Sequence, residues 1–309
     1  MTIRVLKPGL STTVQDRGRF GYAHLGISPC GAADALSLRI ANLLVGNDEY
    51  APVLEMTLLG ATLEFEQGAV MALSGARCDC KVGQYRVAQD SAVSIPGGGV
   101  LQCGSITSGV RTYLAIQGGL DVPLVMGSAS TDLRGGFGGV AGRRLQAGDM
   151  LKTGTGGGQS PRRLRTGAVD DRPHPGPIRV TRGAQNDWFS PDEWTGFLAA
   201  GYVGSEQSDR AGLRLSGRPV KSSQSKQLLT DGIPLGAVQI PQDGQPIILF
   251  VDQQTTGGYP KIANVIAADM HRIGQIRPRD DVRFSEVSLT VAIEALRAQQ
   301  QWMEAIWQK

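Results

Sequence analysis

The chain has 309 residues, which is enough for one large or two medium domains that bury a real core. Hydrophobic residues make up 41% and charged residues 19%, so a disordered or fibrous protein is excluded. No apolar run approaches the roughly 18 residues that a membrane span needs, and the N-terminus has no signal-peptide pattern. We therefore expect a cytoplasmic protein that has no membrane partner.

Charge and cysteine usage narrow the class further. The net charge is +3, and Lys and Arg rarely interleave with aromatic residues, which argues against a nucleic-acid partner. Cys78 and Cys80 have no second Cys or His pair at zinc-like spacing, so no metal site is expected. The four cysteines are interpreted as small buried side chains on strands, with a metal or redox role as the alternative.

Glycine is the most informative residue type. Its 42 occurrences cluster with short β-branched runs, which is typical of many short strands joined by tight turns. In the first half we predict one helix over 33–45, ended by Gly46, with an apolar face of Leu36, Ile40, Leu43 and Leu44. The predicted strands there are 3–6, 53–57, 61–66, 70–74, 92–95 and 112–117.

The second half follows a segment rich in Gly, Arg and Pro, 154–177, which predicts a linker. Beyond it we predict strands at 178–182, 237–240 and 246–252, and helices at 191–200 and 261–271. Ser288 is the predicted N-cap of a terminal helix. The apolar face of that helix would hold Leu289, Ile293, Leu296, Gln300, Met303 and Trp307.

The two halves resemble each other in short strings. Tyr113–Gly119 parallels Ile248–Gly258, and Leu145–Leu151 parallels Ile276–Val282, at offsets that an insertion would produce. Two related β-barrel lobes are the economical interpretation, and chance similarity of glycine turns is the alternative. The predicted organisation is a lobe over 1–155, a linker over 156–177, a second lobe over 178–286 and a C-terminal helix over 287–309.

Several common catalytic motifs are missing from the sequence. It has no P-loop string, no dinucleotide-binding fingerprint and no Gly-x-Ser-x-Gly elbow. The histidines, His24, His174 and His271, have no metal-ligand or triad spacing, and no biotin-attachment string is present. Hydrolytic triads, zinc hydrolases and biotin carriers are therefore disfavoured.

The strongest positive signal is the string from Asp252 to Lys261, where an apolar strand ends in two amides, two hydroxyls and a Gly-Gly pair. The N–H groups of a glycine turn, a helix N-terminus and a lysine at its start together suit a phosphate or carboxylate. Asp252 could act as a base or hold a metal-bound phosphate. A polar turn whose side chains cap one another is an equally good interpretation.

Two further polar segments, 12–19 and 127–132, are candidates for substrate binding. A solvated hairpin and a capped turn are the respective alternatives. Residues 208–215 bring two arginines to a strand edge, which packing and surface charge explain equally well. The candidate side chains of the first two segments are Gln15, Asp16, Arg17, Ser128, Ser130 and Thr131.

Four strings, 13–19, 41–47, 127–131 and 253–261, together resemble the KipA family. Its members include the C subunit of 5-oxoprolinase, allophanate hydrolase subunit 2 and biotin-dependent carboxyltransferases. The last string is long and ordered, and therefore highly specific. Residues 277–280 depart from the family's Pro-Gly-Asp turn. This departure is expected to alter one turn, and it puts no catalytic residue in doubt. The resemblance implies a mainly β fold of two cyclophilin-like β-barrel lobes, with a few short helices and a C-terminal helix.

The resemblance also implies a function, a cofactor and partners. Family members work with a KipI-type B subunit together with a LamB/YcsF-type A subunit to open 5-oxoproline, the small-molecule substrate, to glutamate. ATP is the implied cofactor. The resemblance leaves open whether Mg²⁺ accompanies ATP and whether ATP binds at a subunit interface. This chain alone is expected to be inactive. The alternatives are the carboxyltransferase or allophanate hydrolase subunit 2 of a urea-carboxylase-like system, and a non-enzymatic regulator that binds a KipI-type protein.

The chemistry of a lactam suggests roles for the candidate residues. A lactam amide is a poor electrophile, so its hydrolysis calls for activation, donors for the developing oxyanion and a base. We expect the string to face the substrate-binding candidates of segments 12–19 or 127–132 across a groove. The predicted catalytic residues are Asp252, Lys261, Thr255 and Thr256, and substrate or phosphate binding is predicted for Gln253, Gly257, Gly258 and Tyr259.

Overall fold

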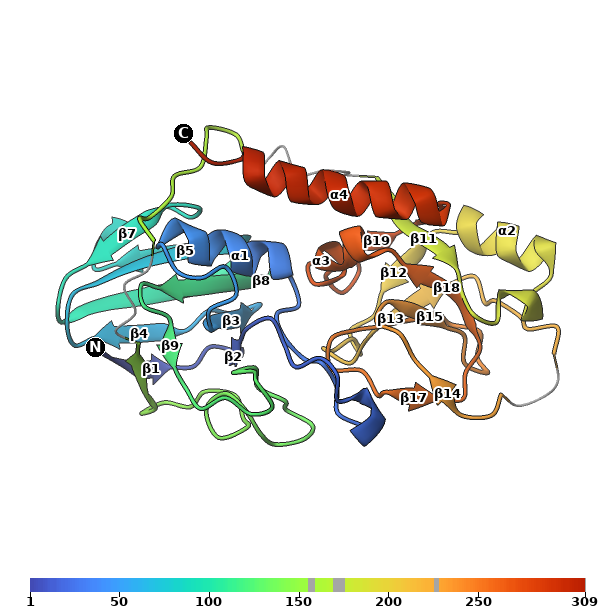
Figure 1. The fold of residues 1–309 in the computed structure, drawn as a ribbon, viewed down its shortest axis with the longest axis horizontal. Coiled ribbons are helices and arrows are strands. Elements are labelled where there is room, and N and C mark those ends of the chain that lie inside the picture. Colours follow the sequence, from blue (N-terminus) through green and yellow to red (C-terminus); the bar gives the residue numbers. More distant parts are fainter. Residues whose placement is uncertain (155–158, 169–175, 225–227, 309) are drawn as a thin grey trace. The chain divides into compact units, whose positions relative to one another are not determined.

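The computed structural model describes residues 1–154, 159–168, 176–224 and 228–308, and its fold is mainly β (Figure 1). The strands are β1 (Thr2–Lys7), β2 (Ser11–Gln15), β3 (Val53–Thr57), β4 (Thr62–Phe65), β5 (Ala69–Val82), β6 (Tyr85–Arg86), β7 (Ala92–Ile95), β8 (Gly99–Ile116), β9 (Leu120–Asp121), β10 (Met150–Thr153), β11 (Ile178–Arg182), β12 (Tyr202–Gly204), β13 (Gly212–Gly217), β14 (Asp231–Gly232), β15 (Ala237–Gln239), β16 (Ile247–Leu249), β17 (Thr256–Gly257), β18 (Lys261–Val265), β19 (Asp281–Val282) and β20 (Phe284–Glu286). The helices are α1 (Ala35–Leu44), α2 (Pro191–Ala199), α3 (Met270–Ile273) and α4 (Leu289–Ala305), with short 3-10 helices η1 (Ala23–Leu25), η2 (Asn186–Trp188) and η3 (Ala267–Asp269).

The chain divides into two compact units. Unit 1 comprises Met1–Arg19, Cys30–Asp171 and Ile306–Lys309, and unit 2 comprises Phe20–Pro29 and Arg172–Ala305. Much of the predicted linker, 156–177, lies outside the described residues. Within the described part, the Arg162 N–H donates to Leu43 O at 3.2 Å, and the Arg165 N–H donates to Ile306 O at 2.9 Å. The predicted domain boundaries stay a prediction.

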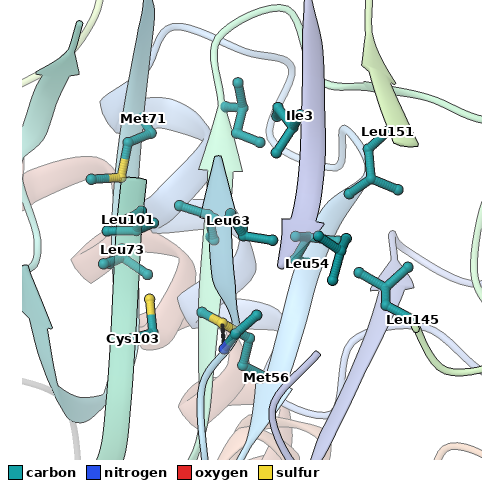
Figure 2. Packing of buried hydrophobic residues seen from close by; sticks show 14 of the residues in the cluster. Ile3, Leu54, Met56, Leu63, Met71, Leu73, Leu101, Cys103, Leu145 and Leu151 are labelled. Atoms are coloured by element: carbon teal, nitrogen blue, oxygen red, sulfur yellow. Dashed lines mark hydrogen bonds between the residues drawn. The ribbon is translucent and has the colours of Figure 1, made fainter. Parts of the chain in front are cut away.

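Unit 1 is built on one curved sheet that forms a half-barrel. Its strand order is β2-β3-β8-β4-β1-β10-β9, and β5 pairs along the long strand β8. Because alternate residues of a strand point to one face, the apolar positions of these strands meet inside the curve. Figure 2 shows this packing. The labelled residues of the cluster include Ile3, Leu54, Met56, Leu63, Met71, Leu73, Leu101, Cys103, Leu145 and Leu151.

Capping residues set both ends of helix α1: Asp34 precedes it and Gly46 follows it. The Asp34 side chain accepts the Ser37 N–H as an N-cap. Gly46 follows the helix in the left-handed conformation, at φ 76°, and its N–H donates to Leu43 O at 3.2 Å. The predicted apolar face is buried, so the predicted helix and its glycine stop are confirmed.

Asn47 ties the end of α1 to the sheet of unit 1. It is 4% exposed, its Nδ2 donates to Ile116 O at 2.8 Å, and its Oδ1 accepts the Gly118 N–H at 2.9 Å. Asn47→Ala leaves both backbone groups without this partner and should lower the free energy of unfolding by about 1–3 kcal/mol. Denaturant unfolding of the purified chain measures this loss. Unchanged stability would mean that water replaces the amide at no cost.

Unit 2 is a nearly closed barrel. Its eight strands run in the order β19-β12-β13-β16-β15-β18-β11-β20. The two edge strands, β19 and β20, are separated in the chain by Arg283 alone, so the edges of the sheet must curl toward each other. Aromatic rings pack helix α2 against strand β20: the rings of Phe197 and Phe284 stack with centroids 4.7 Å apart. The predicted mainly β fold of two barrel-like lobes is confirmed.

The terminal helix forms as predicted, but most of its predicted apolar face is exposed, and of that face Met303 is buried. Ser288 Oγ accepts the Val291 N–H at 3.3 Å, which is the expected N-cap contact. Leu289 is 70% exposed, whereas Gln299 and Met303 are buried. Gln299 packs inward because its Nε2 donates to Ala268 O of η3 at 2.7 Å. No helix in the described part of the chain is long and apolar enough to cross a membrane.

The four cysteines are free thiols and all are buried. Cys78 and Cys80 lie on β5 and Cys103 lies on β8, as the prediction of small buried side chains on strands requires, whereas Cys30 lies outside the strands. Hydrogen bonds with the Cys103 and Cys80 thiols lower the pKa of Cys78 to about 4. Among the described residues no His, Cys, Asp or Glu side chains gather as they would around a metal ion.

Candidate functional site

The string from Asp252 to Lys261 crosses one side of the unit 2 barrel. Strand β16 ends at Leu249, and a turn follows in which the Gln253 N–H donates to Phe250 O at 2.9 Å. The chain then forms the short strand β17 and enters β18 at Lys261. The string therefore links three strands of one unit, which fixes its side chains relative to the barrel.

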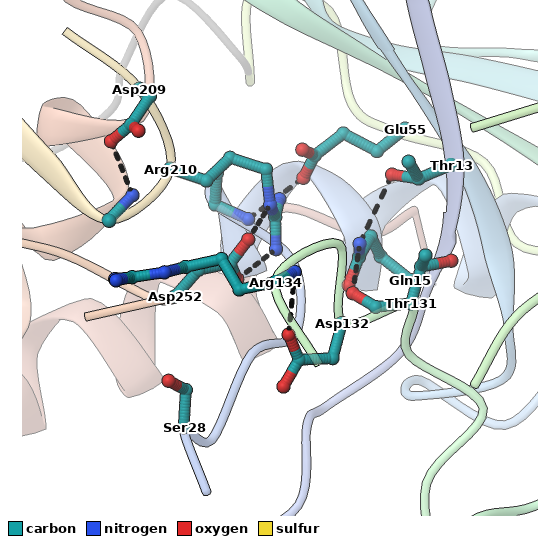
Figure 3. Close-up of polar contacts among 12 residues, drawn as sticks. Thr13, Gln15, Ser28, Glu55, Thr131, Asp132, Arg134, Asp209, Arg210 and Asp252 are labelled. Atoms are coloured by element: carbon teal, nitrogen blue, oxygen red, sulfur yellow. Dashed lines mark hydrogen bonds and ion pairs between the residues drawn. The ribbon is translucent and has the colours of Figure 1, made fainter. Parts of the chain in front are cut away.

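Asp252, the predicted base, is buried in an ion pair with Arg210. Arg210 Nε donates to Asp252 Oδ2 at 2.8 Å, and its second terminal nitrogen donates to Oδ1 at 3.0 Å (Figure 3). Asp252 is 3% exposed and Arg210 9%. A carboxylate held at both oxygens by a guanidinium is a strong, geometrically specific contact. The catalytic role of Asp252 stays a prediction, and such a role would require that this pair open.

Gln253 and Thr255 hold the string against Ile233. Gln253 Nε2 donates to Ile233 O at 3.0 Å, and the Ile233 N–H donates to Thr255 O at 3.0 Å. The backbone oxygen of Gln253 also accepts the Ser28 hydroxyl. Gln253 is buried, whereas Thr256 is exposed and Tyr259 is 45% exposed. The predicted catalytic residue Thr256 and the predicted binding residue Tyr259 are therefore open to a ligand.

The glycines of the string do not form the predicted turn. Gly257 lies in β17, opposite Asp231 of β14, and neither it nor Gly258 has a positive φ. A concave anion nest of successive N–H groups uses left-handed residues, so this one is absent at these two positions. Gly257 is closely packed instead: a Cβ atom there would lie 2.7 Å from Ile233 Cδ1, and the Ile233 side chain would have to shift.

Lys261 does not start a helix, and the predicted helix over 261–271 is wrong. Residues 261–265 form β18, which pairs with β15 and with β11, and only 270–273 are α-helical. Lys261 is 2% exposed, and its Nζ lies 3.1 Å from Asp231 Oδ2. The ammonium of Lys261 lowers the pKa of Asp231, which keeps that carboxylate charged.

These contacts do not fit a bound triphosphate. The Gly257–Gly258 pair offers no nest, and the one lysine of the string already has a carboxylate beside it. ATP, if this chain binds it, is not held by the string in the manner of a P-loop. A single carboxylate or carbonyl group suits the remaining donors better.

A cavity of about 650 Å³ lies beside the end of the string in unit 2. Gly258, Tyr259 and Pro260 line it together with Trp188, Lys221 and Ser222. The lining combines two aromatic rings with a cation and a hydroxyl, which suits a small ligand that carries both apolar and polar groups. Trp188, Lys221 and Ser222 come from segments that the sequence analysis did not select, because no local motif marks them.

In unit 1 the structure brings together the two predicted polar segments. Asp16 Oδ1 accepts the hydroxyls of Ser128, at 2.6 Å, and of Ser130, at 2.5 Å, and its Oδ2 accepts the Ala129 N–H at 2.6 Å. The Gly18 N–H donates to Oδ1 at 2.8 Å. One carboxylate thus satisfies four donors, and these contacts hold residues 128–130 against the end of β2.

The neighbours of Asp16 are equally buried. Gln15 Nε2 donates to Thr13 Oγ1 at 3.1 Å and to Thr131 O at 3.3 Å (Figure 3). Gln15 and Thr131 are each 0% exposed. Arg17 is exposed and lies over the Tyr50 ring, with its Cζ 5.3 Å from the ring centroid. Burial favours a structural role for this cluster, and its role in substrate binding stays a prediction.

The string and the Asp16 cluster belong to different units. The prediction that they face each other across a groove therefore stays a prediction. Arg210, Asp231 and Gln239 are the polar partners that sequence reasoning missed. Arg210 lies in the segment 208–215, whose two arginines the sequence marks. Its pairing with Asp252 spans 42 residues, and no local sequence pattern indicates that pairing.

The half-barrel of unit 1, the nearly closed barrel of unit 2 and the polar string are the features by which the class of this protein can be judged. Comparison with known sequences names that class. Residues 25–286 match the carboxyltransferase domain, subdomains A and B, and the chain belongs to this family. The relatives include the 5-oxoprolinase C subunit of Escherichia coli, which is 41% identical over 98% of this chain and 97% of its own length. The protein of the same name from Haemophilus influenzae is 37% identical over 98% of this chain and 97% of its own length. The resemblance inferred from the motifs is thereby confirmed.

Solved structures extend the likeness to the fold. The crystal structure of Kluyveromyces lactis urea amidolyase superposes with a TM-score of 0.92 at 31% identity, and covers 99% of this chain and 20% of its own. The K. lactis urea carboxylase structure has the same TM-score and identity over 99% of this chain and 29% of its own. The same two-lobed fold therefore occurs both as a separate protein of this size and within longer enzymes.

Proposed function

We propose that the chain is the C subunit of a multi-subunit, ATP-dependent 5-oxoprolinase, which converts 5-oxoproline, ATP and water to glutamate, ADP and phosphate. The observation that carries the proposal is the 41% identity to the E. coli 5-oxoprolinase C subunit over almost the whole of both chains. The proposed partners, in the cytoplasm, are one subunit of the KipI type and one of the LamB/YcsF type. ATP, with Mg²⁺, would bind on a partner or at a subunit interface.

In this proposal the chain binds and orients the lactam. The exposed Thr256 hydroxyl and the Tyr259 phenol would donate hydrogen bonds to the substrate. Asp252 would act only after release from Arg210, with which it forms a bidentate pair. The hydroxyl and amide groups of the string are of the type that stabilises a developing oxyanion.

The purified chain alone should release no phosphate from ATP in the presence of 5-oxoproline, because no complete nucleotide motif is present in its sequence. Co-expression with the two partner subunits should restore both phosphate and glutamate formation. Phosphate release and glutamate are measured in parallel, with 5-oxoproline omitted as the control. Turnover by the isolated chain at the rate of the assembled enzyme would contradict the assignment of this chain as one of several subunits.

A second candidate is the carboxyltransferase component of a urea-carboxylase-like system. The superposition on urea carboxylase, with a TM-score of 0.92, favours it. In that case a biotin group carried by another chain would deliver the carboxyl group. Urea-dependent consumption of carboxybiotin by the chain, with no 5-oxoproline turnover in the complex, would select this function. Stable partner binding without turnover of either substrate would select a non-enzymatic regulator.

A further inference from the structure

Lys261 and Asp231 form an ion pair whose two ends differ sharply in exposure. The Lys261 side chain is 2% exposed and the Asp231 side chain is 54% exposed. A buried ammonium is costly without an opposite charge, whereas an exposed carboxylate gains little from an ion pair. The buried cation therefore needs an anion, and the carboxylate beside it, which also accepts the Gly232 N–H at 2.7 Å, is half exposed to water.

Gln239 places an unused donor next to this cation. It stands opposite Lys261 in the register of β15 and β18, and it is 1% exposed. Within the described part of the chain its Nε2 has no hydrogen-bond partner. A buried amide donor that lacks an acceptor is a rare and costly feature in a folded protein. The ammonium and the amide N–H thus belong to residues that are paired on neighbouring strands, and of the two only the ammonium has an acceptor among the described residues.

The short ribbon of β14 and β17 lies against both groups. Asp231 of β14 contacts the Lys261 ammonium, and its partner in the ribbon is Gly257 of β17. A Cβ atom at Gly257 would lie 3.2 Å from Gln239 Nε2. The same Cβ atom would lie 2.7 Å from Ile233 Cδ1, so glycine is what lets the ribbon pack closely against the Gln239 amide. Each strand of the ribbon is two residues long, so its displacement breaks few backbone hydrogen bonds.

We propose that Lys261 and Gln239 form the binding site for the carboxylate of a small ligand, and that Asp231 takes the place of this carboxylate until the ligand arrives. A ligand carboxylate has two oxygens, of which one would accept from the ammonium and the other from the Gln239 amide. Asp231 reaches only the first of these donors. The incoming carboxylate would displace Asp231 into solvent and satisfy the donor that the protein leaves unpaired.

The identity of the ligand rests on the proposed function. 5-Oxoproline is a lactam that carries a carboxylate, so the site would hold the carboxylate while the exposed groups of the string contact the ring. 2-Pyrrolidinone has the same lactam ring without the carboxylate, and it separates the two contributions. The site itself would bind a carboxylate whichever reaction the complete enzyme catalyses.

The test measures binding by calorimetry to the full-length chain, alone and in complex with its KipI-type partner. Asp231→Asn keeps the shape of the side chain but removes the internal competitor, so 5-oxoproline should bind about threefold to tenfold more tightly. Lys261→Met should weaken its binding about 10- to 100-fold, and Gln239→Leu about threefold to tenfold. 2-Pyrrolidinone should bind weakly and respond to none of the three substitutions.

Glu304→Gln, which removes one exposed negative charge from α4, is the matched control and should leave binding unchanged. If Asp231→Asn weakens binding or leaves it unchanged, the ion pair is structural and the proposal is wrong. Equal binding of 2-pyrrolidinone, or no binding of 5-oxoproline to either form of the wild type, also overturns it. If the variants behave as expected but the complete complex does not hydrolyse 5-oxoproline, the carboxylate site stands and the proposed function falls.

Discussion

Asp16→Ala is expected to lower the free energy of unfolding of unit 1 by about 3–5 kcal/mol, because it removes a buried charge and leaves its donors unpaired. Asp16 is 8% exposed, and Ser128 and Ser130 are each 0% exposed, so water cannot readily replace the lost carboxylate. The Ala129 N–H loses its 2.6 Å contact at the same time. Denaturant unfolding gives the change in stability, and hydrogen exchange at residues 128–131 shows where it arises.

The matched control is Asp121→Ala, at an exposed position of the same sheet, which should change stability by less than about 0.5 kcal/mol. Asp16→Asn should lie between the two, since an amide of the same shape keeps one acceptor oxygen. A variant Asp16→Ala that is as stable as the control would contradict the structural role. Partner binding that fails while stability is kept would instead point to an interface role for the cluster.

Strand positions were the part of the fold most open to prediction. The predicted strands 53–57, 92–95 and 178–182 coincide with β3, β7 and β11. In each, a short run of β-branched or apolar residues ends at a turn-forming residue or a change in composition, and a run of this length and composition favours a strand over a helix. The long strands β5 and β8 were recognised only in part, since glycines and serines interrupt their apolar pattern.

Strand β2 shows why a local pattern can fail. Four of its five residues are polar, yet Thr12, Thr13 and Gln15 are buried. Polar groups of this strand are satisfied by distant segments: Thr131 Oγ1, for example, donates to Val14 O at 3.0 Å. A hydropathy pattern cannot indicate that polar residues are buried when their hydrogen-bond partners lie more than 100 residues away in the chain.

The same limit explains the two errors at helices. Residues 261–271 have a composition that a helix would accept, but 261–265 pair with two strands, and tertiary pairing overrides weak local preference. In α4 most of the predicted apolar face is exposed, whereas Gln299 is buried and its amide donates to η3. For the site, the sequence marked the string itself, whereas Arg210, Asp231 and Gln239 became visible only through the fold.

Asp269→Asn is the second substitution with a large expected effect, and it acts on unit 2. Arg179 Nε and one terminal nitrogen donate to the two oxygens of Asp269 at 3.1 and 2.6 Å, and the Arg179 N–H donates at 2.8 Å. Arg272 adds a fourth donor at 3.4 Å. The Asp269 side chain is 1% exposed, so the pair fastens η3 and α3 to strand β11 away from water. Removing its charge should lower the free energy of unfolding by about 3–5 kcal/mol.

The pH dependence of this effect has a definite sign. Burial raises the pKa of Asp269, but the hydrogen bonds and charges of Arg179 and Arg272 outweigh burial, and the net pKa is below the ordinary value of 3.8. The folded state therefore favours the charged carboxylate, and its contribution is complete at pH values well above that ordinary value, which applies to the unfolded chain. As the pH falls through the lower, folded pKa, that contribution is lost.

The difference in stability between the wild type and Asp269→Asn should thus be constant from about pH 5 to 8 and shrink below about pH 4. Urea unfolding at a series of pH values, followed by circular dichroism, measures it. Asp187→Asn, at an exposed position of the same unit, is the control and should show no comparable loss at any pH. A difference that grows on acidification would mean that Asp269 is protonated in the folded protein. In that case the two guanidinium groups would donate to a neutral carboxyl group, and no ion pair would contribute to the link between β11 and η3.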